Sequence, residues 1–325
     1  MLLQVSLLDI LQAHRRIRDL VRETPLIRSE VLSAHAGADI WLKMEGLQTT
    51  GSFKLRGAYN KILSLTNEER RRGVVTASSG NHAQAIAYVA SRLNISALII
   101  VPGITPETKK AGILRYGGEL IVYGDKYDDA EAYALELSRT TGRTLIHGSE
   151  DNEIIAGQGT VALEALMQMQ DFDAILVPAG GGGILCGTAA AAKAINPRIQ
   201  VIGVQTDTSA PFYHSFKAKQ MINVEFGTSI ADGLYGGITQ ANLEMALQLV
   251  DDFALVQEDQ LSKAIYWMAR EHHAMIEGAA AVGIAALLSD AVPNLRGKKI
   301  LTVVTGSNVD SKLFTDIMHK HEYAF

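Results

Sequence analysis

The stretch Ala174-Ile-Leu-Val-Pro-Ala-Gly-Gly-Gly-Gly-Ile184 decides the fold. Its first five residues predict a buried strand, the glycines turn the chain, and the residues that follow open a helix. Four consecutive glycines expose backbone N–H groups, which can converge on an anion at the N-terminus of that helix. A tight turn alone needs fewer glycines. The stretch therefore predicts a site for a phosphate group.

The same alternation of strand and helix runs through much of the chain. Apolar runs predict strands at 40–44, 73–77, 97–101, 119–123, 144–147, 174–178, 200–205 and 299–304. Helices are predicted at 6–20, 82–93, 128–140, 158–169 and 278–288, among others. Repeated units with strands that are apolar on both faces predict parallel sheets covered by helices. The count is too high for one small sheet, so we expect an α/β protein of two parallel-sheet domains with the active site in the cleft.

Composition narrows the class of protein and its partners. The chain has 325 residues, of which 47% are hydrophobic and 20% charged, as in ordinary globular proteins. A net charge of −5 gives no reason to expect a nucleic acid or a membrane surface as partner. The single cysteine, Cys186, excludes an internal disulfide and predicts a buried thiol in a reducing cytoplasm. We see no signal peptide or transmembrane stretch and expect a cytoplasmic protein.

The stretch Gly51-Ser-Phe-Lys-Leu-Arg-Gly-Ala58 places Lys54 between two glycines and beside an aromatic ring. One interpretation is a loop that enters a helix, with a solvated lysine. The other is a lysine held on a rigid turn and partly desolvated, so that its amine can act as nucleophile and base.

Two more strands end in polar stretches. Ser78-Ser-Gly-Asn-His82 offers hydroxyls, an amide and helix N–H groups suited to a carboxylate, and Thr305-Gly-Ser-Asn308 offers a neutral hydroxyl. Both lie at the carboxyl ends of strands, where α/β proteins bind ligands. A reactive lysine, a phosphate site, a carboxylate pocket and a neutral hydroxyl together suit pyridoxal 5′-phosphate and an amino-acid substrate.

The glycine run also admits other interpretations. No Gly-Lys-Ser/Thr follows it, which excludes a Walker A loop. Gly181, Gly183 and Gly187 come near a dinucleotide fingerprint, but the next strand ends in Gln205 where an acid would bind ribose. A nicotinamide-linked dehydrogenase would leave Lys54 unexplained, and a non-catalytic phosphate-binding protein would leave the set of motifs unexplained.

With these motifs in order, the chain resembles the pyridoxal-phosphate enzymes of the serine/threonine dehydratase family, which includes threonine ammonia-lyases and serine racemases and has the tryptophan-synthase-β-like fold (fold type II). The resemblance covers almost the whole chain. Its marks are Lys43-Met-Glu45, Thr50 to Ala58, Ser78 to Gln84, Ile155-Ala-Gly-Gln-Gly-Thr160, Gly180 to Gly183, Ile230-Ala-Asp-Gly233 and Gly306 to Asn308.

The resemblance implies a role for each cofactor-side residue. Lys54 carries pyridoxal 5′-phosphate as a Schiff base, and Phe53 packs against the cofactor. The glycines Gly180, Gly181, Gly182 and Gly183 hold its phosphate. Asn81 contacts the phenolic oxygen, and Thr305 faces the pyridine nitrogen.

On the substrate side, the resemblance implies a site made by Ser78, Ser79, Asn81 and His82, with Ser78 at the carboxylate. Lys54 removes the α proton and the β-hydroxyl leaves. The implied activity is L-threonine or L-serine dehydratase, which yields a 2-oxo acid and ammonia.

Three departures from the family pattern keep alternatives open. Ser79 is a residue that serine racemases have, and a hydroxyl opposite Lys54 could return a proton, so Ser79 is a second candidate catalytic residue and serine racemase an alternative. The segment His147-Gly-Ser-Glu150 differs from the family and admits another substrate, such as 3-hydroxyaspartate. Gln205 replaces an acid that binds a divalent cation in many relatives, so we expect no metal site unless Asp207 restores it.

The resemblance also predicts the domain organisation. Residues 1–50 and 149–325 would form a large domain that binds the cofactor, and residues 51–148 a small domain on the substrate side. We expect no C-terminal regulatory domain of the kind found in biosynthetic threonine deaminases. Relatives of this size imply a homodimer.

Overall fold

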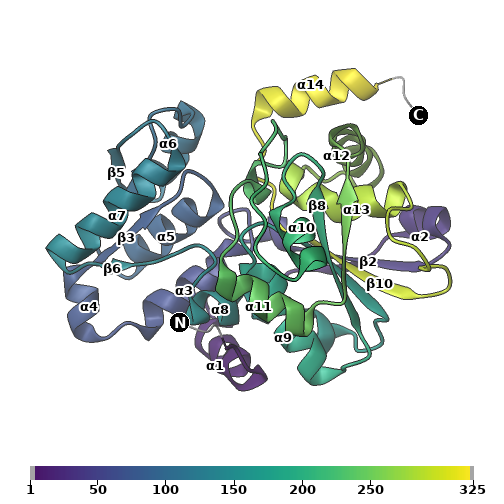
Figure 1. Ribbon diagram of the computed structural model, residues 1–325, viewed down its shortest axis with the longest axis horizontal. Helices are drawn as coiled ribbons and strands as arrows, with labels where there is room; N and C mark the ends of the chain where they lie inside the picture. The colour runs from purple at the N-terminus through teal and green to yellow at the C-terminus, as the bar shows by residue number, and fades with distance from the viewer. Residues whose placement is uncertain (1–3, 323–325) are drawn as a thin grey trace.

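The structure is a computed structural model that describes residues 4–322, and it contains two separate β-sheets (Figure 1). The larger sheet has six strands in the order β1-β2-β10-β7-β8-β9. All its neighbouring strands run parallel except β1, which pairs antiparallel with β2. The strands are β1 (Leu26–Arg28), β2 (Asp39–Met44), β7 (Ala174–Pro178), β8 (Gln200–Thr206), β9 (Asp252–Val256) and β10 (Lys299–Val304).

The smaller sheet has four parallel strands in the order β5-β4-β3-β6. They are β3 (Val74–Ala77), β4 (Ala97–Val101), β5 (Glu119–Val122) and β6 (Thr144–Leu145). The expected α/β class with parallel sheets is confirmed. The four strands fall within the predicted small domain, and the domain boundaries themselves stay a prediction.

Helices surround both sheets, and α3 lies where the two parts of the molecule meet (Figure 1), packing against both α5 and α8. The helices beside the smaller sheet and at this junction are α3 (Lys54–Ser64), α4 (Asn67–Arg72), α5 (Asn81–Arg92), α6 (Glu107–Arg115), α7 (Tyr127–Thr141) and α8 (Asn152–Gln168). The others are α1 (Leu7–Ile17), α2 (Glu30–Ala36), α9 (Gly183–Ile195), α10 (Pro211–Ala218), α11 (Gln240–Leu249), α12 (Glu258–His272), α13 (Gly278–Leu288) and α14 (Ser311–His321). Two short 3-10 turns, η1 (Glu45–Leu47) and η2 (Asp232–Leu234), complete the described elements.

The structure corrects several predicted boundaries. Helix α8 begins at Asn152 rather than 158, because the Asp151 side chain accepts hydrogen bonds from the backbone N–H groups of Glu153 and Ile154 and so caps it. The predicted strand 144–147 is shortened to Thr144–Leu145. Residues 146–149 instead form the segment that borders the candidate site.

Apolar side chains make up most of the interior, which also holds the one cysteine. Cys186 is buried on α9, as expected, and burial raises the pKa of its thiol to about 12. No helix within residues 4–322 is long and apolar enough to cross a membrane.

Candidate active site

The glycine run from Gly180 to Gly183, called the glycine cradle below, joins β7 to α9 and packs closely against neighbouring residues. Gly182 caps α9 with φ of +104°, a left-handed backbone conformation that favours glycine. A Cβ on Gly181 would lie 2.5 Å from the Ser149 Oγ, and one on Gly182 would lie 3.0 Å from the Phe212 ring. The backbone at the N-terminus of α9 is therefore left bare, as binding of a phosphate requires.

Asn242, on α11, fixes this cradle to the segment that follows β6. Its Nδ2 donates to the carbonyl oxygens of Gly181 at 2.7 Å and Ser149 at 3.2 Å, and the side chain is fully buried. Sequence analysis assigned no role to Asn242, because no local pattern links it to Gly181, 61 positions earlier, or to Ser149, 93 positions earlier.

Lys54 is the first residue of α3, and its amine reaches toward the glycine cradle. Its Nζ donates to the Gly148 carbonyl oxygen at 2.9 Å. The same oxygen lies 3.5 Å from the place that a Cβ on Gly183 would occupy. A single peptide group thus separates the amine from the cradle.

The environment of Lys54 changes its acidity. The residue is half-buried beside the Phe53 ring, whose centroid is 5.2 Å from Nζ. Desolvation lowers the pKa of the Lys54 amine to about 8, and the carboxylate of Glu277 partly opposes this effect. The prediction of a partly desolvated lysine is therefore supported over a solvated one.

His82, on α5, packs beside the same amine as a neutral ring. Burial, followed by the charge of Lys54, lowers the pKa of His82 to about 3. Its Nε2–H donates to the Ile146 carbonyl at 3.3 Å, and its buried Nδ1 has no hydrogen-bond partner. A Cβ on Gly148 would lie 3.4 Å from the His82 ring and 3.7 Å from the Lys54 Nζ, so the glycine leaves room between them.

Asn81 takes part in a chain of side-chain contacts on the other side of the site. Its Nδ2 donates to the Glu277 Oε1 at 2.7 Å, and its Oδ1 accepts from the Asn308 Nδ2 at 2.7 Å. Glu277 is buried, and burial followed by the charge of Asp232 raises its pKa to about 7. Sequence analysis gave Glu277 no role, because its burial depends on the folded chain.

The remaining predicted residues lie at strand ends as expected. Ser78 and Ser79 are half-buried in the turn between β3 and α5, where the Ser78 Oγ accepts from the Gly80 N–H at 3.3 Å. Thr305 is buried at the end of β10, and its carbonyl accepts from the Phe53 N–H at 3.1 Å. The turn before Lys54 is thereby joined to the end of β10.

These features fit a phosphate-bearing aldehyde. An amine with a lowered pKa can condense with a carbonyl. The glycine cradle beside the amine presents backbone N–H groups at a helix N-terminus, which can bind a phosphate. The unpartnered Nδ1 of buried His82 is a further acceptor beside the amine.

Gln205, where the predicted resemblance would place a metal-binding acid, is hydrogen-bonded inside the protein. Its Nε2 donates to the Ala179 carbonyl at 2.8 Å and its Oε1 accepts from the Tyr213 N–H at 2.9 Å. Asp207 is exposed. In the part of the chain that the structure describes, no three His, Cys, Asp or Glu side chains are grouped to hold a metal ion.

Comparison with curated proteins finds enzymes of amino-acid breakdown. An L-threonine ammonia-lyase of Thermotoga maritima is 39% identical over 320 residues, which cover 97% of this chain and 79% of that protein. The catabolic L-threonine dehydratase of Staphylococcus aureus is 38% identical over 310 residues, 94% of this chain and 90% of the relative.

Comparison with solved structures finds enzymes of similar fold. Maize serine racemase has a TM-score of 0.93 and 34% identity, with 98% of each chain covered. Isoform 2 of tomato (Solanum lycopersicum) threonine deaminase has a TM-score of 0.88 and 32% identity, with 98% of this chain and 96% of that chain covered. These matches confirm the predicted family resemblance, the enzyme class and the cofactor. Residues 17–306 match the pyridoxal-phosphate dependent enzymes as a family, and this chain belongs to that family.

Proposed function

We propose that the protein is an ammonia-lyase that converts a β-hydroxy amino acid, L-threonine or L-serine, into a 2-oxo acid and ammonia. The observation that carries the proposal is the Lys54 amine, with a pKa of about 8, separated by the Gly148 peptide from a phosphate cradle. The names of the curated relatives, which are 38–39% identical over most of this chain, support the reaction and its substrate.

The lowered pKa of Lys54 matters for both of its tasks. At pH 7 an amine of pKa about 8 is about 9% neutral, whereas one with the ordinary value of 10.5 is about 0.03% neutral. The free-base form, which attacks carbonyls and accepts protons, is thus about 300 times more abundant. When bound, pyridoxal phosphate supplies the electron sink for negative charge at the substrate α-carbon. Lys54 holds the cofactor and removes the α proton.

Other residues bind and orient. The cradle from Gly180 to Gly183 holds the phosphate, and Phe53 packs against the cofactor ring. The turn with Ser78 and Ser79 opens α5, a helix of 12 residues whose N-terminal N–H groups attract the substrate carboxylate. Asn81 and Thr305 are proposed as further cofactor contacts.

The test is a comparison of Lys54→Ala with Lys61→Ala, which removes another lysine of α3. We expect the first change to abolish the visible absorption of the enzyme–cofactor complex and to lower formation of 2-oxo acid from threonine and serine by more than about 10³-fold. The control should retain both within about threefold, because the Lys61 amine pairs with Asp151 at 2.8 Å, whereas the Lys54 amine reaches the Gly148 carbonyl. A yellow, active Lys54→Ala protein would refute the proposal.

A serine racemase is the second candidate, and Ser79 together with the similarity to maize serine racemase favours it. We expect Ser79→Ala to abolish any formation of D-serine and to spare formation of 2-oxo acid. Loss of both products would contradict the role proposed for Ser79. The same assay with L-threo-3-hydroxyaspartate tests whether the segment from His147 to Glu150 accepts a second carboxylate.

A homodimer and a cytoplasmic location belong to the same proposal and rest on the resemblance to the family. So does the division into a large domain (1–50 and 149–325) and a small one (51–148), which the two separate sheets support. Sedimentation of the purified protein would test the dimer.

A further inference from the structure

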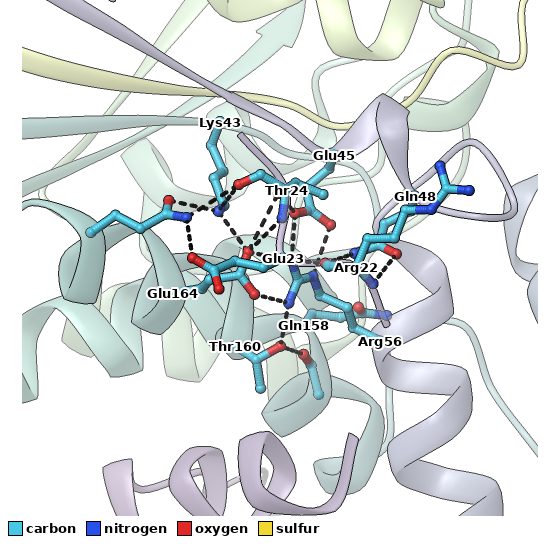
Figure 2. Close-up of polar contacts among 12 residues, drawn as sticks. Arg22, Glu23, Thr24, Lys43, Glu45, Gln48, Arg56, Gln158, Thr160 and Glu164 are labelled. Atoms are coloured by element: carbon cyan, nitrogen blue, oxygen red, sulfur yellow. Dashed lines mark hydrogen bonds and ion pairs between the residues drawn. The ribbon is translucent and has the colours of Figure 1, made fainter. Parts of the chain in front are cut away.

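Four buried charged side chains lie together behind the helix that carries Lys54. Lys43, Glu45 and Arg56 have no exposed surface and Glu164 has 6%. They come from β2, η1, α3 and α8, and Figure 2 shows them converging on one point. Two cations and two carboxylates leave the cluster formally neutral.

Arg56 is bound on both edges of its guanidinium. Its Nε and Nη2 donate to the two carboxylate oxygens of Glu45 at 2.8 and 2.7 Å. Its Nη1 and Nη2 donate to the two oxygens of Glu164 at 3.0 and 2.9 Å. Such paired contacts fix the plane of the guanidinium as well as its position, which a lysine amine cannot do.

The two carboxylates are in turn held in place. The Lys43 Nζ donates to the Glu164 Oε1 at 2.6 Å and to the Thr24 carbonyl at 2.7 Å. The Thr24 hydroxyl donates to the Glu45 Oε1 at 2.5 Å (Figure 2). The acceptors of Arg56 therefore cannot rotate freely.

Arg56 and Lys54 project from opposite sides of α3. Residues two positions apart in a helix differ by about 200° in direction. Lys54 reaches the Gly148 carbonyl, whereas Arg56 reaches α8 and η1. The helices α3 and α8 also meet closely, since a Cβ on Gly157 would lie 2.6 Å from the Gly57 Cα. The contacts of Arg56 thus oppose rotation of α3 about its axis.

Small rotations would matter at the amine. An extended lysine places its nitrogen about 8 Å from the helix axis, so a turn of about 10° moves it by about 1.4 Å. A misplacement of about 1 Å can slow a reaction by about 10²-fold.

We propose that Arg56 is a positioning residue, which fixes the rotation of α3 through the two buried carboxylates and thereby aims the Lys54 amine at the reacting atoms. The proposal rests on the proposed function of Lys54. It assigns Arg56 no contact with substrate or cofactor.

The test is Arg56→Lys in the enzyme loaded with pyridoxal phosphate. The change keeps the charge balance but removes the paired contacts. We expect kcat to fall by about 10²-fold while KM stays within about threefold, and the pH midpoint of the visible absorption band to move. The control is Arg70→Lys, because Arg70 donates to the Leu63 and Leu65 carbonyls at 2.7 and 3.1 Å, at the other end of α3. The Arg70→Lys variant should keep the original kcat and the original pH midpoint of the absorption band.

The outcomes separate this proposal from the proposed function. Normal kcat and a normal absorption band in Arg56→Lys would overturn the positioning role. Retention of the band in Lys54→Ala would instead overturn the function. If Arg56→Lys does not fold, Thr24→Val removes the hydrogen bond to Glu45 without changing a charge. A several-fold loss of kcat with a displaced band would then support the proposal, and unchanged values would overturn it.

Discussion

Replacement of Glu277 by Gln should make the stability of the cofactor-free protein, its free energy of unfolding, fall less as the pH rises. Glutamine keeps the shape and can still accept the hydrogen bond from the Asn81 Nδ2. It cannot titrate. Burial raises the pKa of Glu277 from 4.5 to about 7, so the folded protein binds this proton more tightly than the unfolded chain does.

The sign and size follow from that difference. Glu277 contributes its full stabilisation below pH 4.5, and the contribution is lost as the pH rises through 7. With each pKa unit worth 1.36 kcal/mol, the loss between pH 5 and pH 8 is about 2.5 kcal/mol in the free energy of unfolding. The Gln variant lacks this loss. Its stability relative to the original protein should rise by about that amount over the same interval.

The assay is urea unfolding of the cofactor-free proteins at pH 5, 6, 7 and 8. Contributions from groups that Glu277 does not influence cancel when the unfolding free energy of the original protein is subtracted from that of the variant. Glu225→Gln, which makes the same chemical change at an exposed position, serves as control. If the unfolding free energy of Glu277→Gln minus that of the original protein stays constant or falls as the pH rises, the reasoning is refuted.

The same variant should change the amine of Lys54. The Glu277 carboxylate raises the Lys54 pKa against the effect of desolvation, so its removal should lower that pKa below about 8. More of the amine is then neutral at pH 7, and capture of pyridoxal phosphate by the cofactor-free protein should be faster there. Slower capture at pH 7, in a variant that folds normally, would contradict the role of Glu277.

Two further changes test contacts around the site. Gly148→Ala adds a methyl group 3.7 Å from the Lys54 Nζ, an ordinary contact distance, so the fold should persist. The narrowed space should lower kcat/KM for threonine about tenfold more than for serine, because serine has one methyl group fewer. Equal losses of kcat/KM for the two substrates would contradict this prediction. Gln205→Ala leaves the Ala179 carbonyl and the Tyr213 N–H without partners, and should destabilise the protein by about 3 kcal/mol in urea unfolding and weaken cofactor binding. Unchanged stability would contradict it.

The parts of the site that could be predicted from sequence are those in which a local stretch carries its own chemistry. The run from Gly180 to Gly183 follows an apolar strand and precedes a helix, so its anion-binding backbone can be inferred without tertiary contacts. Lys54 between glycines, and the polar stretches after β3 and β10, are local signals of the same kind. Parallel strands then bring such ends together at one edge of each sheet.

The parts that could not be predicted depend on contacts between distant segments. Asn242 lies 93 positions from Ser149, and only the folded chain shows that its amide joins that residue to the glycine cradle. The raised pKa of Glu277 comes from burial, which a single position in the sequence does not reveal. The start of α8 was missed because Asp151 caps it ahead of the apolar pattern.

The contacts that join the two parts of the molecule differ in strength from one side of the site to the other. On the side of α3 and α8, buried Arg56 bridges two carboxylates, and loss of one partner from such a pair costs about 3–5 kcal/mol. On the side of α6, Lys109 pairs with Asp232 of η2, with 32% and 55% of their side chains exposed, and an exposed pair contributes at most about 1 kcal/mol. Displacement of α6 from η2 is therefore far easier than displacement of α3 from α8. Because Lys54 belongs to α3, the buried contacts of Arg56 also hold the helix that carries the reactive amine.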